Sequence, residues 1–201
     1  MNQDLKNISL SIDSNDSLLI KEYKKGNRLA YNLIVRKYQK RIYWVIRKIV
    51  LDHDDADDIT QEVFIKLYKS LIEFRGDSSL MTYIYRMAVN YSLNHLTRIK
   101  NKNTKVTSIN DKHINLKNED KSFDEIMDNK QKTKLLEEAM SRLPEQQRAV
   151  FNLRYYDNLT YEEISKILNK SVGGLKANYF HAVKKIGEYL KQKEVNLEIL
   201  F

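Results

Sequence analysis

Residues 159–191 read LTYEEISKILNKSVGGLKANYFHAVKKIGEYLK, and the spacing of their apolar residues predicts two helices joined by a short turn. Thr160 and Glu163 are placed as a capping box, which satisfies N–H groups at the start of the first helix. Ser171 is placed to cap the second helix, which should run to about Lys191. A short capped helix, a tight turn and a longer basic helix together predict a helix-turn-helix.

The second helix of this pair separates an apolar face from a basic face. Its predicted core stripe is Leu175, Tyr179, Ala182, Ile186 and Leu190. The opposite face presents Lys176, Ala177, Phe180, His181, Lys184 and Lys185. Basic and small groups at such positions suit a helix that enters the major groove of DNA. A plain helical hairpin with a solvated basic face stays open as the alternative, because such faces are common.

The composition of the 201 residues favours helices throughout. With 5 Gly and 1 Pro, the sequence has few of the residues that build the tight turns of an all-β fold. Helical spacing recurs over residues 18–100 and 131–192, whereas residues 101–130 have little periodicity. We therefore predict an all-α fold of two small helical domains on a flexible linker, the second being the helix-turn-helix domain. Residues 1–17 should be loose, and the tail 193–201 has no interpretation.

The chain is basic, with a net charge of +8 and an isoelectric point of about 9.4. This charge suits a polyanion, because each Lys or Arg near a phosphate releases a counterion. A ribosomal or membrane-surface protein fits equally well. The lack of cysteine excludes disulfides and cysteine-ligated metal sites. No apolar run approaches the length of a membrane span, so we expect a cytoplasmic protein without membrane insertion.

No catalytic arrangement is visible in the sequence, which has no nucleotide-binding glycine loop, nucleophile elbow or zincin motif. The acidic stretch 52–58 lacks the central Gly of an EF-hand, and His53 has no partner at a metal-binding spacing. Its acids more simply stabilise a helix start. We expect no enzyme, cofactor or metal. A partner-facing role stays open for the outward residues Asp57, Asp58, Gln61 and Glu62.

Another predicted helix, over about residues 80–100, carries a polar face beside a loop. Its residues Arg86, Asn90, Asn94 and Arg98 recur at spacings of four and so share one face. Tyr83 and Tyr85 lie close by, after the loop of residues 75–79. Such groups could stack on unpaired bases and hydrogen-bond to them, although they could also only solvate an exposed face. Trp44, in the apolar pattern of an earlier helix, is expected in the core.

Several motifs in a fixed order resemble the extracytoplasmic-function (ECF) family of RNA polymerase sigma factors. Those resembling its first domain are DDITQEVF at 57–64, FRGD at 74–77 and TYIYRMAVN at 82–90. Those resembling its second domain are LPEQQR at 143–148, LTYEEI at 159–164 and SVGGLK at 171–176. The resemblance covers about residues 18–100 and 131–190. It favours DNA binding over a plain helical hairpin at residues 159–191 and over a merely solvated polar face on the helix of residues 80–100.

The resemblance implies an alternative sigma factor that binds core RNA polymerase, recognises −35 and −10 promoter elements and captures melted −10 DNA. The polymerase clamp would be met by Asp57, Asp58, Gln61 and Glu62. The −10 element would be met by Arg75, Gly76, Asp77, Ser78, Tyr83, Arg86, Asn90 and Asn94. The −35 element would be met by Ser171, Lys176, Ala177, Asn178, Phe180, His181 and Lys184. The linker would thread towards the RNA exit path, and an anti-sigma factor is a possible further partner.

The sequence departs from the family pattern at several of these positions. Gly174 stands where the family often has Thr, and Asn178, His181 and Val183 stand where it often has Arg. These changes affect the expected −35 sequence more than the function. Tyr83 replaces the usual Trp, and stacking should survive that change.

Two other classes remain to be separated from a sigma factor. A dimeric helix-turn-helix regulator would bind palindromes and would not need the motifs of residues 57–90. A basic ribosomal protein would show no promoter preference.

Overall fold

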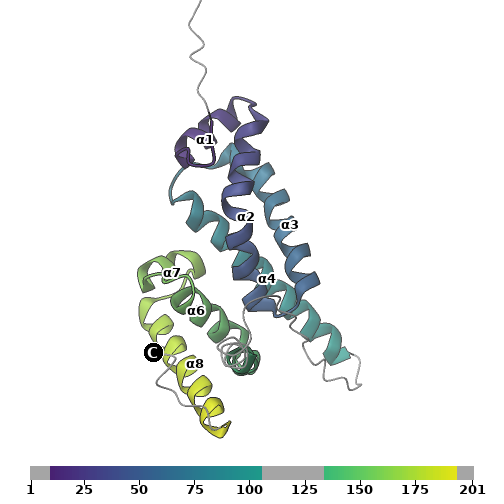
Figure 1. Ribbon diagram of the computed structural model, residues 1–201, viewed down its shortest axis with the longest axis vertical. Coiled ribbons are helices and arrows are strands. Elements are labelled where there is room, and N and C mark those ends of the chain that lie inside the picture. The colour runs from purple at the N-terminus through teal and green to yellow at the C-terminus, as the bar shows by residue number, and fades with distance from the viewer. Residues whose placement is uncertain (1–9, 106–133, 194–201) are drawn as a thin grey trace, which may run out of the picture.

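The computed structural model describes residues 10–105 and 134–193, and every regular element within them is helical. The predicted all-α fold is therefore confirmed. Helices α2, α3 and α4 form the long part of the molecule, α6 and α7 pack against it, and α8 packs on α6 and α7 (Figure 1). The bounds are α1 Asp16–Lys24, α2 Arg28–Val50, α3 His53–Ser70, η1 (a 3-10 turn) Leu71–Glu73, α4 Leu80–Lys105, α6 Glu145–Tyr155, α7 Tyr161–Leu168 and α8 Val172–Gln192. Residues 134–141 are also helical.

The helix starts follow the caps that the sequence predicts. Ser171 caps α8 as predicted, by accepting a bond from the Gly174 N–H, and Asn27 is found to cap α2. Thr160 and Glu163 form the complete capping box of α7, and these hydrogen bonds hold the pKa of the Glu163 carboxyl below its usual value. The missing N–H of Pro144 suits the first position of a helix, but Pro144 occupies the cap position of α6 instead.

Two helices extend past the boundaries expected from apolar periodicity. α1 begins at Asp16, inside the segment 1–17 that was expected to be loose, and α4 continues to Lys105, inside the expected linker. Both extensions consist largely of polar residues, which leave no apolar period to detect. Residues 106–133, which include the rest of the expected linker, and residues 194–201, which are most of the tail, lie outside the described residues.

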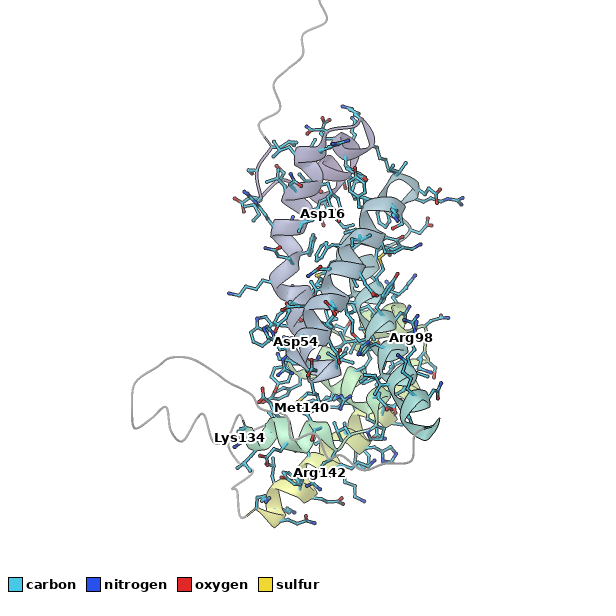
Figure 2. All side chains as sticks on the ribbon, turned by 90° about the vertical axis from the view of Figure 1, so that its right-hand side faces the viewer. Asp16, Asp54, Arg98, Lys134, Met140 and Arg142 are labelled. Carbon is cyan, nitrogen blue, oxygen red and sulfur yellow. The ribbon has the colours of Figure 1, made fainter. Side chains whose placement is uncertain are left out.

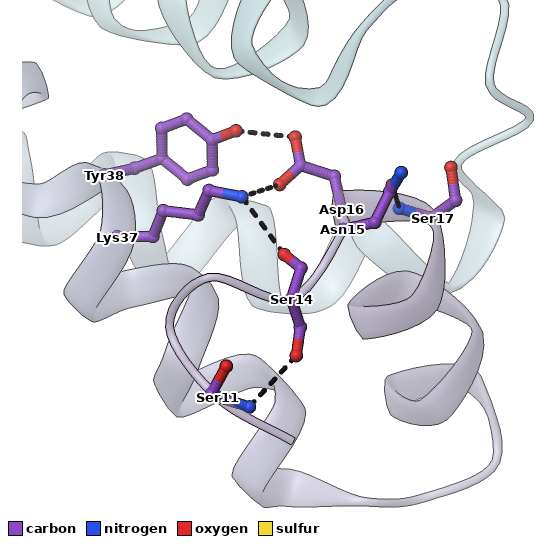
Figure 3. A network of polar contacts seen from close by, with 7 residues as sticks. All are labelled: Ser11, Ser14, Asn15, Asp16, Ser17, Lys37 and Tyr38. Atoms are coloured by element: carbon purple, nitrogen blue, oxygen red, sulfur yellow. Dashed lines mark hydrogen bonds and ion pairs between the residues drawn. The ribbon is translucent and has the colours of Figure 1, made fainter. Parts of the chain in front are cut away.

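A polar network at the first residue of α1 joins this helix to α2 (Figure 3). The Asp16 carboxylate accepts hydrogen bonds from the Tyr38 hydroxyl at 2.6 Å and from Lys37 Nζ at 2.8 Å. Lys37 Nζ also donates to the Ser14 carbonyl at 3.2 Å. These bonds, with the Asn15 cap, order residues whose sequence predicted a loose terminus.

The core of the first domain, α1–α4, is an apolar stripe on each of its long helices. Fully buried members from α2 include Ile34, Ile42, Ile46 and Ile49, and α3 and α4 contribute Val63, Leu67, Ile84 and Ala88. Trp44 was expected in this core, but its side chain is 46% exposed. With 3.6 residues per turn, position 44 falls outside the stripe formed by residues 42, 45, 46 and 49.

The second domain, residues 134–192, has no apolar core of its own that includes all its helices. Phe151, Ala182, Ile186 and Leu190 pack with the helical segment 134–141. Other buried side chains belong to the same cluster as the core of the first domain: Val150, Leu153, Ile164, Ile167 and Leu175. One hydrophobic cluster therefore runs through both domains, and a second cluster lies within the second domain.

Polar contacts reinforce this interface. The Tyr85 hydroxyl donates to Asp157 at 2.7 Å, and Arg41 Nε lies 3.4 Å from the same carboxylate oxygen. Burial, followed by the negative charge of Asp157, raises the pKa of Tyr85, so its hydroxyl stays protonated as a donor. The Asn152 amide donates to the Val45 carbonyl at 3.1 Å across α6 and α2.

Among the described residues, no helix is long and apolar enough to cross a membrane. The same residues contain no group of three or more His, Cys, Asp or Glu side chains arranged to hold a metal ion.

Candidate nucleic-acid interface

The α8 helix has the rotation that its sequence predicts. Leu175, Ala182, Ile186 and Leu190 are buried, and Tyr179 is half-buried. The exposed side chains are Lys176, Ala177, Phe180, His181, Lys184 and Lys185, while Asn178 is half-buried and Ser171 is exposed at the cap. A cationic face with one large apolar group, Phe180 at 63% exposed, can meet both phosphates and base edges.

Two lysines on this face have different surroundings. Lys176 Nζ lies 5.8 Å from the centre of the Tyr161 ring on α7, within range of a cation–π interaction. Lys184 Nζ lies 3.9 Å from a Glu188 oxygen, and both side chains are largely exposed. An exposed pair of this length is weak, so Lys184 can readily exchange Glu188 for a phosphate.

On α3, the predicted partner-facing residues are exposed. Ile59 and Val63 are buried, which turns Asp57, Asp58, Gln61 and Glu62 to solvent. The same face continues as an apolar stripe that the sequence reasoning missed: Ile65, Tyr68 and Ile72, which are 58%, 41% and 61% exposed. Gln61, Ile65, Tyr68 and Ile72 follow one another at steps of four, three and four, and this helical spacing was the available signal.

The loop between η1 and α4 is exposed and bends at a glycine. Gly76 has φ +84°, a left-handed backbone conformation that residues other than glycine rarely adopt. Arg75 and Asp77 are exposed, and Ser78 is half-buried. The half-buried Tyr83 ring lies 5.0 Å from the Phe74 ring, so Phe74 fixes one side of Tyr83.

On α4, the predicted polar face is only partly free. Asn90 and Asn94 are exposed. The Arg86 guanidinium donates to the Lys166 carbonyl at the end of α7, through Nε at 3.1 Å and an Nη at 2.6 Å. Tyr85, expected beside this face, is fully buried against the second domain. The structure thus brings Asn90 and Asn94 to one free surface and engages Arg86 within the protein.

Comparisons with known proteins match both halves of the chain. The family model for sigma-70 region 2 matches residues 34–102, and that for sigma-70 region 4 matches residues 133–186. The RNA polymerase sigma-H factor of Pseudomonas aeruginosa is 30% identical over 183 residues, covering 88% of this chain and 94% of that protein. The ECF RNA polymerase sigma-E factor of Escherichia coli K12 is 31% identical over 172 residues, covering 83% and 90%.

Two solved structures share the fold. The sigma factor RpoE in complex with the anti-sigma factor NepR, from Bartonella quintana, has a TM-score of 0.66 at 16% identity, covering 80% of this chain and 96% of that one. CnrH in complex with the cytosolic domain of CnrY has a TM-score of 0.62 at 16% identity, covering 88% and 97%. At such identities the likeness concerns the fold alone.

A helical region 2 followed by a helix-turn-helix region 4 defines a transcription initiation factor of the sigma-70 class. With its relatives at 30% and 31% identity over most of both chains, the chain belongs to the ECF family of RNA polymerase sigma factors. It is an alternative sigma factor that binds core RNA polymerase and recognises promoter DNA. The dimeric regulator and the ribosomal protein are thereby set aside.

Proposed function

We propose that three separate surfaces divide the work of promoter recognition in this sigma factor. The observation that carries the proposal is that each predicted set is largely exposed on a different part of the fold: α3 for polymerase, the 75–78 loop with α4 for −10 DNA, and α8 for −35 DNA. No side chain in these sets is placed to supply chemistry of its own, so RNA synthesis is left to the polymerase. Because polymerase and promoter DNA lie in the cytoplasm, we place this chain there.

The polymerase surface is Asp57, Asp58, Gln61 and Glu62, and its exposed apolar continuation supports this assignment. Acidic groups give such a surface its partner preference, and desolvated apolar groups give it affinity. We propose the clamp helices of the largest polymerase subunit as the contact.

The −10 surface is the exposed loop from Arg75 to Ser78 together with Tyr83, Arg86, Asn90 and Asn94. Flipping a base out of a duplex costs a few kcal/mol, which stacking and amide hydrogen bonds in a pocket can offset. For Arg86 to take part, it must first leave the Lys166 carbonyl.

The −35 surface is the α8 face with Ser171, Lys176, Ala177, Asn178, Phe180, His181 and Lys184. Lys176 can donate to guanine, and Ala177 or Phe180 can pack on a thymine methyl group. The absence of Arg at positions 178 and 181 reduces bidentate contacts, so the −35 preference should differ from that of relatives with Arg there.

We include an anti-sigma factor among the partners. The support is the fold shared with RpoE, which was solved in complex with the anti-sigma factor NepR.

The test of the proposed function is reconstitution with purified core polymerase. The chain should be retained by core polymerase in a pull-down, and the holoenzyme should transcribe a set of promoters that core alone ignores. On one such promoter, the chain should also bind the −10 non-template strand as an oligonucleotide. Retention by core polymerase without selective transcription would refute promoter recognition. Selective transcription without binding of the −10 oligonucleotide would refute the capture of melted −10 DNA.

A further inference from the structure

The start of the −10 loop is held by a lysine from a distant helix. Lys24, in the last turn of α1, donates from Nζ to the Phe74 carbonyl at 2.7 Å. Phe74 is the last residue before the loop and the cap of η1. This solvent-exposed bond joins a charged donor to the backbone at the point where the chain leaves the helical core.

Two tyrosines make the same kind of contact further up this segment. The Tyr31 hydroxyl donates to the Phe64 carbonyl, and the Tyr23 hydroxyl donates to the Tyr68 carbonyl. With Lys24, three side chains from α1 and α2 thus bond backbone oxygens along α3 and η1. Of the three acceptors, the Phe74 carbonyl bonded by Lys24 lies furthest along the chain, and it is the only one of the three beyond α3.

The other end of the loop is fixed as well. The Ser79 hydroxyl accepts from the Thr82 N–H at 3.1 Å and lies 2.8 Å from the Thr82 hydroxyl. Between the two fixed ends lie the four residues 75–78, which carry the proposed contacts to −10 DNA. Phe74 also packs on Tyr83, so the bond to its carbonyl bears on the position of that ring.

We propose that Lys24 is a positioning residue for the capture of melted −10 DNA. The proposal rests on the proposed function and adds a residue to it. Lys24 itself touches no base; it holds the Phe74 carbonyl so that the loop and Tyr83 are already arranged when a base flips out. Pre-ordering the loop removes an entropic penalty that a free loop would meet on binding.

The chain offers a matched control in the neighbouring residue. Lys25 lies in the same turn but pairs with Glu22 at 2.7 Å. Lys24→Met and Lys25→Met remove the same charge from the same end of α1, and only the first removes the bond to the loop. α1 lies at the end of the molecule away from the second domain, as the positions of Asp16 and Arg142 show (Figure 2), so neither change reaches the interface between domains.

The experiment uses holoenzyme made from core polymerase and the full chain, on a promoter selected with the wild-type protein. Lys24→Met should slow open-complex formation on duplex DNA and weaken binding of the −10 non-template oligonucleotide, each about 3- to 10-fold. Lys25→Met should match the wild type in both assays. Lys24→Arg should recover most of the loss, because Arg can donate to the same carbonyl.

Salt separates positioning from direct contact with DNA. If Lys24 positions the loop, the wild-type advantage in oligonucleotide binding stays the same between 50 and 200 mM salt. If Lys24 contacts a phosphate, that advantage shrinks by about 2.6-fold over the same range, and the proposal is overturned. It is also overturned if Lys24→Met and Lys25→Met behave alike. Wild-type holoenzyme that transcribes but binds no −10 strand refutes the proposed function instead.

Discussion

Lys176 and Lys184 lie two turns apart on α8, and we predict that replacing them will change DNA binding in different ways. Lys176 Nζ lies 5.8 Å from the centre of the Tyr161 ring, and we propose that this lysine meets a base edge. Lys176→Ala should therefore cost about 1–3 kcal/mol at one base-pair position and relax the preference there. Lys184→Ala should instead weaken binding to every sequence alike, since phosphates carry no sequence information.

The salt dependence of the Lys184 effect follows from its surroundings. Its ion pair with Glu188 is exposed and 3.9 Å long, so this weak pair competes little with a phosphate for the Lys184 ammonium. One phosphate contact contributes a slope of about 0.9 in log K against log salt. Over the fourfold rise from 50 to 200 mM salt, the wild-type advantage over Lys184→Ala should shrink by about 3.5-fold.

The assay is binding of holoenzyme to a promoter library with a randomised −35 duplex, sequenced at both salt concentrations. The full chain is needed because Ile164, Ile167 and Leu175 of the helix-turn-helix belong to the core shared with the first domain. If Lys176→Ala shifts all sequences equally and changes the salt slope, Lys176 is a phosphate contact. The orientation assigned to α8 on DNA would then be wrong.

Three further changes test the other surfaces. Asp58→Lys with Gln61→Ala should weaken core-polymerase binding at least tenfold while the helical circular-dichroism signal is retained; unchanged affinity would remove this surface from the polymerase interface. Asn90→Ala should lower open-complex formation on duplex promoters but leave −35 binding intact, and equal binding of the −10 oligonucleotide by both proteins would contradict the assignment. Tyr85→Phe removes the donor to Asp157 and should lower the free energy of unfolding in urea by about 0.5–1.5 kcal/mol; no change would mean that this bond contributes nothing to the interface.

Local features of the fold were predictable because their causes are local. The Thr160 capping box and the core stripe of α8 depend on residues a few positions apart, and both are confirmed. The predicted burial of Trp44 was wrong because its helix carries apolar residues on more than one side. Its apolar side chain suggested burial, whereas its position around the helix axis turns it away from the core. Exposure of Asn90 and Asn94 also followed from helical spacing alone.

Contacts between distant segments left no trace in the sequence pattern. Arg86 bonds a backbone carbonyl, and any residue type can supply a carbonyl, so no motif marks its partner Lys166. The same holds for Lys24 and the Phe74 carbonyl, 50 positions apart. Asp157 reads as a turn residue, and its bond to Tyr85 depends on how the two domains pack.

The shared core also has a consequence for synthesis of the chain. Val45 and Asn152, which hydrogen-bond between α2 and α6, are 107 positions apart, so at 5–20 residues per second roughly 5–20 s separate their translation. Throughout that interval the first domain carries an uncovered face. Arg41 and Arg86 border this face and bear a charge before their partners exist. Charged residues beside an exposed apolar surface oppose aggregation, so we expect the groups that later join the domains to keep the nascent chain in solution first.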